Sequence, residues 1–566
     1  MKPNWAILPT VPASVVREIG LPQAHCQLLY NRGLTTGASV QEFLSPDTSH
    51  SHDPWLMPDM DAAVSRLITA AEQGETIGVF GDFDIDGISG TAVMSTALRD
   101  LGADVVSYIP DRVAEGHGLG LEAVQSLASR GVTLLVTVDC GSTSESEIEE
   151  ASDLGVDTIV TDHHLLLDQP PYPVVAMVNP RRPDSEYPFE HLTGAGTAYK
   201  VAQALYRYRD RQEPPELLAL TALGTVGDVG PLQGENRYIV AEGLRRMNAS
   251  PSVGLEALTA VSGIGGQNLD TGSLSFQIIP RLNAPGRLAD PGISLSLLTT
   301  TDLAQARSMA SQIDRLNAVR RTATEKGVKQ AEGQILERWG DEIPGIVMVG
   351  RRDWSDGIVG LIASRIAETY TRPVIAVAVG DQLSRASARS IDGFNLMEVI
   401  EPAGHLMTQF GGHEQAAGFT IPNENLSELA QQLESVQVSQ GIQSGKPRIE
   451  IDMVCDPSAL ERDMFEFTEK LAPFGKDNPR PKFAASGLRV VDSRSVGSGK
   501  HLKLRVADDK RTWDAIAFRM GDRIAEAPTG SSIDIVYEME TNVWNGRTSL
   551  QLVVEDFEPT QQPRLI

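Results

Sequence analysis

Short apolar runs alternate with longer helical stretches between residues 76 and 161, and this alternation constrains the fold more than any other feature of the chain. The runs TIGVF, DVVSYI, TLLVTVD and DTIVT are separated by stretches such as ISGTAVMSTALRDL and LEAVQSLASRG. Neighbouring parallel strands need a crossover connection, which is usually a helix. The pattern therefore predicts a multidomain α/β protein whose first sheet is parallel.

The rest of the chain divides into further segments. Residues 1–75 are expected to form a helical and loop-rich region packed on the first α/β domain, which occupies residues 76–301. Residues 302–340 contain no proline and predict one long charged helix. A second strand–helix alternation over residues 341–448 predicts another α/β domain. Five short strands within residues 449–566 predict a small β-barrel.

The composition limits the function classes. The net charge of −26 argues against a protein that coats nucleic acid diffusely, because such binding rests on neutralising phosphates. It leaves room for an enzyme with a local basic groove. Three scattered cysteines provide neither a disulfide framework nor a zinc site. The chain lacks a long apolar window and an apolar signal core at its start, so we expect a cytoplasmic protein outside the membrane.

Acidic and imidazole side chains follow the ends of the predicted elements. The stretch VFGDFDIDGISG places three aspartates at alternate positions, where like charges would repel one another. Further candidates stand in TVDCG, TDHH and GTVGDVGPL. The complete set is Asp82, Asp84, Asp86, Asp139, Asp162, His163, His164 and Asp228. Sites in α/β sheets form at the carboxyl ends of the strands, so these residues can share one rim.

This set of side chains predicts a centre with two metal ions. Carboxylates with one or two imidazoles suit Mn²⁺ or Mg²⁺ better than zinc. The set is too acidic for a single divalent ion, and a pair about 3.5–4 Å apart would clamp an in-line phosphoryl displacement. Each motif alone has another reading. The aspartate triplet resembles a calcium loop but has Val93 where an EF-hand needs glutamate, Asp139 is a candidate helix cap, and histidine pairs are often structural.

The motifs GDFDIDG, TVDCG, TDHH and GTVGDV resemble those of the DHH phosphoesterase superfamily, and most closely its RecJ family of bacterial exonucleases. Later stretches, including IIPRLNAPGRLAD, SARSIDGFNL, FGGHEQAAG and LAPFGKDNPRPKF, resemble further family signatures in the same order. The resemblance implies a metal-dependent 5′→3′ exonuclease on single-stranded DNA that uses Mn²⁺ or Mg²⁺ in DNA repair and recombination. It also implies a DHH domain, a DHH-associated domain and an OB-fold, with a single-strand-binding protein and a helicase as candidate partners.

The resemblance also assigns roles to residues. It places metal ligands at Asp82, Asp84, Asp86, Asp139, His163 and Asp228. Asp162 is expected to orient the side chains of the site, and His164 is expected to contact the scissile phosphate. Expected substrate-binding residues are Arg112, Arg281, Asn283, Ser387, Arg389 and His413. Among them Arg112, Ser387 and Arg389 match positions that hold the 5′ phosphate. The alternative for the arginines is surface ion pairing or contact along the strand path.

The sequence departs from the family pattern at a few positions. Gly227 and Gly230 stand where alanine and valine are frequent, and His117 replaces a frequent tyrosine. His117 can still stack on a base. Ser355 and Asp356 replace a common His-Pro pair, and we assign them no role.

The OB-like segment predicts strand binding independently. Residues 486–519 hold eight basic and four acidic side chains, a local balance of +4. His501, Trp513, Phe518 and Trp544 offer faces on which bases could stack. The alternative for Trp513 and Phe518 is a place in the barrel core.

Two rival functions remain open. One is a superfamily enzyme that hydrolyses short oligoribonucleotides or cyclic dinucleotides. The other is a non-catalytic DNA-binding scaffold. The N-terminal region and the OB-like tail favour the nuclease over the first rival, and the complete ligand set favours it over the second.

Overall fold

The computed structural model describes residues 3–112, 115–166, 173–340, 342–440, 448–460, 462–544 and 547–560. These form two compact units. One unit comprises Asp47–Gly445, and the other combines Met1–Pro46 with Lys446–Ile566. Within the described residues, no helix is long and apolar enough to cross a membrane.

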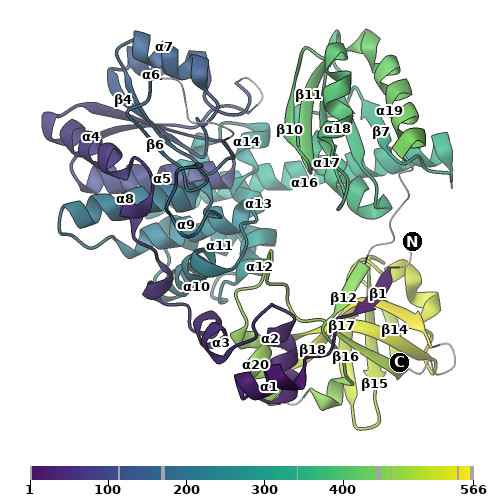
Figure 1. Cartoon of the computed structure of the whole chain (residues 1–566). Coiled ribbons are helices and arrows are strands. Elements are labelled where there is room, and N and C mark those ends of the chain that lie inside the picture. Colours follow the sequence, from purple (N-terminus) through teal and green to yellow (C-terminus); the bar gives the residue numbers. More distant parts are fainter. Residues whose placement is uncertain are drawn as a thin grey trace. The chain divides into compact units, whose positions relative to one another are not determined.

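The first domain of the larger unit is built on a parallel sheet, as predicted (Figure 1). Its five strands lie in the order β3-β2-β4-β5-β6. The strands are β2 (Thr76–Gly81), β3 (Asp104–Tyr108), β4 (Val132–Val138), β5 (Asp157–Thr161) and β6 (Ala176–Val178). Alternate side chains enter two cores. Val79, Val136 and Ile159 pack in one, whereas Phe80 and Val160 pack in the other. The sheet is therefore covered on both faces, as parallel sheets are.

Helices cover this sheet and form a helical half beside it. Those near the sheet are α4 (Met60–Gln73), α5 (Ile85–Asp100), α6 (Leu121–Ser129) and α7 (Glu145–Asp153). The helical half contains α8 (Gly194–Tyr208), α9 (Pro215–Gly227), α10 (Gly234–Ala249), α11 (Val253–Ser262), α12 (Thr271–Ser273), α13 (Ile279–Leu282), α14 (Pro285–Leu288) and α15 (Gly292–Thr299). Helix α8 packs against α5 and α9, which brings its first residues to the rim of the sheet.

A single helix of 37 residues, α16 (Leu303–Trp339), joins the two domains of this unit, as the sequence predicted. It begins at Asp302, whose side chain accepts a hydrogen bond from the Gln305 N–H, and it ends at Gly340 with φ 53°.

The second domain has a mixed sheet in the order β10-β11-β9-β8-β7. Its strands are β7 (Val347–Arg351), β8 (Val374–Ala378), β9 (Leu383–Arg389), β10 (Gln409–His413) and β11 (Ala416–Pro422). Its helices are α17 (Asp356–Tyr370), α18 (Met397–Ile400) and α19 (Leu426–Gln440). Only β7 and β8 pair in parallel, so the alternation correctly predicted an α/β domain but not its antiparallel half.

The smaller unit contains the predicted β-barrel. Strands β14 (Phe483–Val496), β15 (His501–Ala507), β16 (Thr512–Ala517), β17 (Ser532–Trp544) and β18 (Arg547–Pro559) pair in the order β14-β15-β16-β18-β17, and β17 returns to β14. The unit also contains β1 (Asn4–Ile7), β12 (Arg448–Ile451), β13 (Met453–Val454), α1 (Ala13–Ile19), α2 (Gln23–Tyr30), α3 (Gly37–Leu44) and α20 (Arg462–Lys470).

The structure corrects the expected placement of the first 46 residues, which belong to the barrel unit instead of the first α/β domain. Strand β1 pairs in parallel with β12. Leu28, Leu29 and Val40 are buried in the barrel core, because α2 and α3 present their apolar sides to it. Residues from 47 onward do pack on the first domain, where Met57 and Leu67 enter its core.

Candidate metal centre

The aspartate triplet spans the junction between β2 and α5. Asp82 follows the last residue of β2, and Asp84 is the N-cap of α5. The Oδ1 atom of Asp84 accepts hydrogen bonds from the N–H groups of Asp86 at 2.9 Å and Gly87 at 3.4 Å. Asp86 lies in the first helical turn. The end of a strand, a helix cap and a first helical turn therefore bring the three carboxylates together.

The other acidic residues and the histidines lie at neighbouring ends. Asp139 directly follows β4, and its φ of 62° is a left-handed conformation that costs a non-glycine residue energy. Its N–H donates to the Thr161 carbonyl at 3.0 Å. Asp162, His163 and His164 follow β5, and Asp228 is the C-cap of α9. The prediction that these residues share one rim is confirmed.

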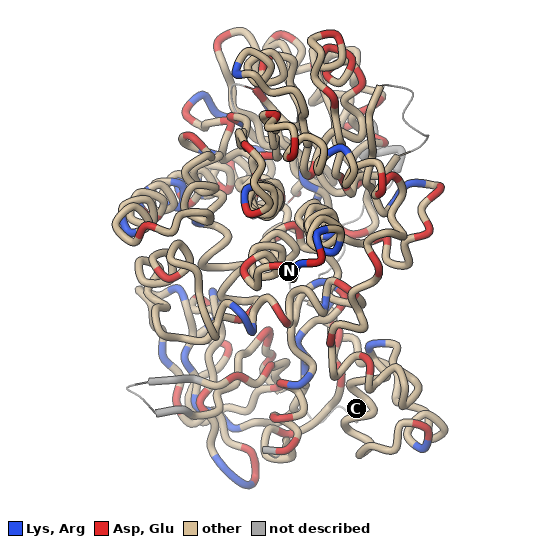
Figure 2. The backbone as a smooth tube through the Cα atoms, turned by 90° about the vertical axis from the view of Figure 1, so that its left-hand side faces the viewer, with Lys and Arg blue, Asp and Glu red and all other residues tan. Residues whose placement is uncertain are grey.

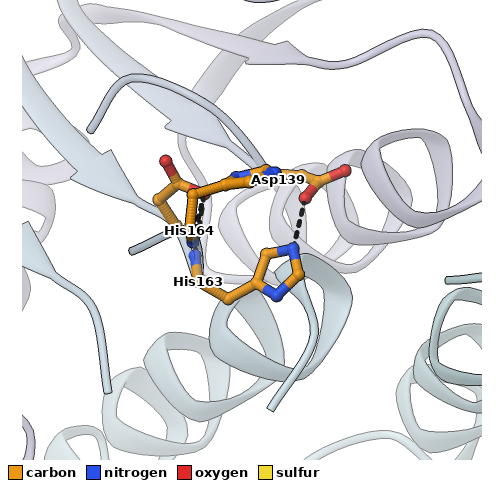
Figure 3. A group of neighbouring side chains, drawn as sticks. Asp139, His163 and His164 are labelled. Atoms are coloured by element: carbon orange, nitrogen blue, oxygen red, sulfur yellow. Dashed lines mark hydrogen bonds and ion pairs between the residues drawn. The ribbon is translucent and has the colours of Figure 1, made fainter. Parts of the chain in front are cut away.

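His163 lies among three carboxylates. Its Nε2 atom is 3.1 Å from Asp139 Oδ1, 3.9 Å from Asp86 Oδ2 and 4.0 Å from Asp228 Oδ2. Figure 3 shows the His163 ring pointing at the Asp139 carboxylate. Among the described residues, three groups place one ligand atom per residue within 4.8 Å of one another. They are Asp82, Asp84 and Asp139; Asp86, His163 and Asp228; and Asp139, Asp162, His163 and His164.

The electrostatics of the centre call for positive charge. Burial and the neighbouring Asp82 raise the pKa of Asp84 to about 6, and burial with Asp84 raises that of Asp86 to about 7. Burial and the same carboxylates hold the pKa of Asp139 well above its ordinary value. Within the described chain, Asp82 Oδ1 is buried without a hydrogen-bond partner. A divalent cation would satisfy this oxygen and offset the repulsion, so the donor set fits Mn²⁺ or Mg²⁺.

Asp162 and His164 form a separate pair at the edge of the centre. His164 Nδ1 donates to Asp162 Oδ1 at 2.7 Å, and the Ser142 N–H donates to Asp162 Oδ2 at 3.0 Å. Burial is the largest influence on the pKa of Asp162 and raises it. The hydrogen bond and charge of His164, the charge of His163 and the hydrogen bond from Ser142 together outweigh burial, so the pKa is lowered. The hydrogen bond to Asp162 raises the pKa of His164 to about 9. His164 is therefore a cation at neutral pH, and Asp162 orients it.

Residues of the second domain lie near the centre. The His164 and His413 rings lie 6.5 Å apart between centroids. On β9, Arg389 Nη1 donates to Ser387 Oγ at 3.0 Å. A Cβ on Gly360 would lie 3.2 Å from Arg389 Nη2, so α17 packs closely on this arginine.

Arg112, Arg287 and Arg389 form a cationic cluster next to the centre. Burial lowers the pKa of Arg287 most, and Arg112, Arg320 and Arg389 lower it further, whereas Asp84 opposes them. The Arg112 guanidinium lies over the Phe83 ring, 4.9 Å from its centroid. Burial lowers the pKa of Arg112, and the charges of Asp82 and Asp84 oppose this effect. Guanidinium groups gathered in this way suit a phosphate.

Two arginines of the RLNAPGR signature differ in their surroundings, and the expectation that Arg281 binds substrate stays a prediction. Arg281 Nε pairs with Asp314 Oδ1 at 2.9 Å, and Arg281 Nη1 donates to the Gln277 carbonyl. Arg287, six residues later in the same signature, joins the cluster instead. Asn283, which the sequence also assigned to substrate, has a buried Oδ1 without a partner among the described residues.

Two further side chains are candidates for contact with a nucleic-acid strand, and one of them lies beside the aspartate triplet. His117 Nδ1 lies 3.6 Å from Asp82 Oδ2, and its ring tilts against Phe83 at 4.5 Å. Phe276 was not singled out from the sequence. It is 82% exposed on a π-helical turn, Leu274–Ile278, and π turns often occur at functional sites.

Burial decides which of the barrel's own aromatic side chains face solvent. Trp513 is buried in the barrel core, with Arg511 over its ring at 3.8 Å. Phe518 is 54% exposed and meets the His501 ring edge-on at 5.4 Å. The side chain of Trp544 lies outside the described residues. In Figure 2, basic residues are interspersed with acidic ones, and Arg505 pairs with Asp514 at 3.8 Å.

Comparison with known proteins identifies the class. The chain matches the DHH family, N-terminal domain, over residues 76–225, the DHHA1 domain over residues 342–438, and the RecJ OB domain over residues 451–556. These three domains and the carboxylate–histidine centre define a DHH phosphoesterase that carries an OB-fold.

Similar proteins identify the family. The chain is 35% identical over 549 residues to the single-stranded-DNA-specific exonuclease RecJ of Bacillus subtilis (strain 168), covering 96% of this chain and 69% of that protein. It is 34% identical over 533 residues to that of Escherichia coli (strain K12), covering 89% and 91%. The crystal structure of RecJ in complex with Mn²⁺ from Thermus thermophilus matches with a TM-score of 0.84 and 29% identity, covering 99% and 80%. The chain belongs to the RecJ family of single-stranded-DNA-specific exonucleases.

Proposed function

We propose that this protein is a metal-dependent exonuclease that degrades single-stranded DNA from the 5′ end, in DNA repair and recombination. The observation that carries the proposal is the position of the arginine cluster beside the carboxylate–histidine centre. Asp84 belongs to that centre, and its charge acts on both Arg112 and Arg287. Because the two sites are close, one bound strand would place a phosphodiester at the centre and its terminal phosphate at the cluster.

The ligand groups suggest how two ions would be held. Asp82, Asp84 and Asp139 would hold one ion, while Asp86, His163 and Asp228 would hold the other. Such ions would supply Lewis acidity toward the scissile phosphate and would lower the pKa of an attacking water. The relatives found with Mn²⁺ and Mg²⁺ from Thermus thermophilus support this choice of metal.

His164 would bind the substrate as a cation. Its Nδ1 is engaged by Asp162, and the side chain is about half exposed, so its Nε2–H is the proton left to face a phosphate oxygen. The pKa of about 9 keeps that proton in place at neutral pH. Asp162 fixes the ring through its bonds to Ser142 and His164.

The arginine cluster would determine which end of the strand is bound for cleavage. Arg112, Arg287 and Arg389 can hold a terminal phosphate through charge-assisted hydrogen bonds, together with the Ser387 hydroxyl. A terminal phosphate carries more negative charge than an internal one, so the cluster would favour it. The barrel, with exposed Phe518, would hold the strand further along.

A single-strand-specific enzyme needs its substrate separated from the complementary strand. We therefore add a helicase and a single-strand-binding protein to the proposal as functional partners.

A substrate panel tests this function. End-labelled single strands, duplexes, short oligoribonucleotides and cyclic dinucleotides are incubated with Mn²⁺, with Mg²⁺ and with chelator. We expect mononucleotides from single-stranded DNA alone, and none in chelator. Preferred hydrolysis of the dinucleotides would favour the first rival function, and strand binding without hydrolysis in either metal would favour the scaffold.

A further inference from the structure

Helix α9 ends at the proposed metal ligand Asp228 with a residue that does not suit such an end. The Gly230 N–H donates to the Thr225 carbonyl at 3.0 Å, and the Val229 N–H donates to the Val226 carbonyl at 3.3 Å. This pair of hydrogen bonds defines a Schellman motif, in which the residue after the C-cap is left-handed and is usually glycine. Here that residue is valine, with a φ of 56°.

The valine strains the backbone at this point. A left-handed conformation brings Cβ close to the following carbonyl oxygen, and a side chain branched at Cβ adds to the crowding. Burial in the core does not offset this cost, because Val229 is 60% exposed. Strain of this kind clusters at functional sites, where the surroundings maintain it. Glycine would suit the helix end better, so the reason for a valine lies outside the folding of the helix.

The position of Val229 points to a contact with substrate. It directly follows Asp228, whose Oδ2 atom lies 4.0 Å from His163 Nε2 in the centre. Leu165 directly follows His164 and is 67% exposed, so a second apolar side chain stands next to a residue of the centre. Both side chains offer a bound nucleotide only an apolar surface.

The sugar is the part of a nucleotide that matches this surface. Bases are usually held by flat aromatic side chains, whereas valine is compact and branched. The deoxyribose of DNA carries a C2′ methylene where the ribose of RNA carries a hydroxyl. An apolar side chain beside C2′ can therefore distinguish the two sugars.

We propose that Val229 is a specificity-determining residue, which packs against the deoxyribose next to the scissile phosphate and thereby selects DNA over RNA. The inference rests on the proposed function, because that function places the scissile phosphate at the centre. A ribose there would press its 2′-hydroxyl against the valine methyl groups, where the hydroxyl loses water and gains no hydrogen-bond partner. The opposing possibility is that Val229 has no role, because single apolar side chains are common on protein surfaces.

Two substitutions change the contact and relieve the backbone. Val229→Gly removes the side chain, and Val229→Asn replaces it with a polar one, and both glycine and asparagine accept a left-handed conformation. Thr371→Gly is the matched control. Among the residues that the structure describes, Val229 and Thr371 are the two β-branched ones with positive φ. Thr371 is the C-cap of α17, at the opposite end of that helix from Gly357, which accepts a hydrogen bond from Arg287.

Each protein digests a 5′-phosphorylated DNA strand and a strand of the same sequence with one ribonucleotide, with Mn²⁺ at one salt concentration. The pause at the ribonucleotide, relative to the same position in the DNA strand, measures rejection of the 2′-hydroxyl. Melting temperature in chelator measures the relief of strain. Affinity for DNA and RNA strands of one sequence, also measured in chelator, gives the comparison without hydrolysis.

The variants should separate strain from specificity. We expect the wild-type protein to pause at the ribonucleotide and Val229→Asn to shorten that pause about 10-fold or more, because the amide offers the hydroxyl a hydrogen bond. Val229→Gly should also shorten the pause and should cleave DNA roughly 3–10-fold more slowly, because the apolar contact with the sugar is lost. Val229→Gly and Thr371→Gly should both melt at a higher temperature, but Thr371→Gly should keep the wild-type pause and rate.

The inference and the proposed function can fail separately. A wild-type protein that does not pause, or an unchanged pause in both Val229 variants, would overturn the inference and leave the exonuclease intact. Failure to cleave either strand would count against the proposed function. The affinities in chelator would then decide the inference, which is overturned if Val229→Asn and the wild type discriminate equally between DNA and RNA.

Discussion

His163 Nε2 and Asp139 Oδ1 lie 3.1 Å apart, although the two residues follow different strands of the sheet. Strand β4 ends at Val138 and β5 at Thr161, and the Asp139 N–H is bonded to the Thr161 carbonyl. The parallel register between the strands therefore sets the distance between the two side chains. Backbone pairing between the strands holds the two residues in place. Either side chain can therefore be removed without disrupting the sheet.

Removing either side chain should abolish hydrolysis and leave the fold intact. We expect Asp139→Ala and His163→Ala to lose single-strand hydrolysis by several orders of magnitude, because each deletes a proposed ligand at the sheet rim. Initial rates on a labelled single strand and melting temperature in chelator check this. Near-normal activity in either variant would refute the proposed ligand set.

The stability of the metal-free protein should decrease as pH rises through the range between the ordinary and the raised pKa values. The pKa values of Asp84 and Asp86, about 6 and about 7, exceed the ordinary value of 3.8. The folded state then binds more protons than the unfolded state, so this contribution to the free energy of unfolding is lost as pH rises toward 7. Melting in chelator at several pH values measures the slope, and saturating Mn²⁺ should flatten it. An identical slope with and without Mn²⁺ would argue against metal at these carboxylates.

Preference for a 5′ phosphate should depend on Arg287 and Arg389. Arg287→Ala and Arg389→Ala should each reduce the ratio of rates on 5′-phosphorylated and 5′-hydroxyl strands. Arg281→Ala is the matched control, because Arg281 is paired with Asp314 and should leave the ratio unchanged. Both substrates need the same sequence and salt, since general phosphate contacts respond to salt. An equal fall on both substrates would make these residues general strand contacts.

Loss of the barrel unit should weaken binding of long strands more than hydrolysis of short ones. The deletion must remove both Met1–Pro46 and Lys446–Ile566, because deleting residues 449–566 alone would expose Leu28, Leu29 and Val40. Affinity for long strands and its salt dependence should fall, whereas turnover of very short oligonucleotides should persist. Unchanged affinity in a folded fragment of residues 47–445 would show that the barrel does not hold DNA.

The sequence predicted those features that are encoded locally. Hydrophobic alternation identified the parallel sheet, and the acidic and histidine residues at strand ends identified the rim where they meet. It did not show which core the first 46 residues join, because the apolar side of α2 fits any hydrophobic surface of suitable shape.

The arginines show the same limit within the site. The signature contains both Arg281 and Arg287, and their chemistry is identical. Packing against α16 gives them different surroundings, since Asp314 on that helix pairs with Arg281. The contact of Gly194 with Asp86 joins residues 108 positions apart and left no sign in either local motif.

The polarity of the first cleavage tests the central claim most directly. One single strand is labelled at its 5′ end in one sample and at its 3′ end in another, and each is sampled at early times with Mn²⁺. The account predicts that the 5′ label appears at once as a mononucleotide, while the 3′ label stays on a strand that shortens progressively. Early release of the 3′ label as a mononucleotide, internal fragments from either sample, or equal activity in chelator would contradict it.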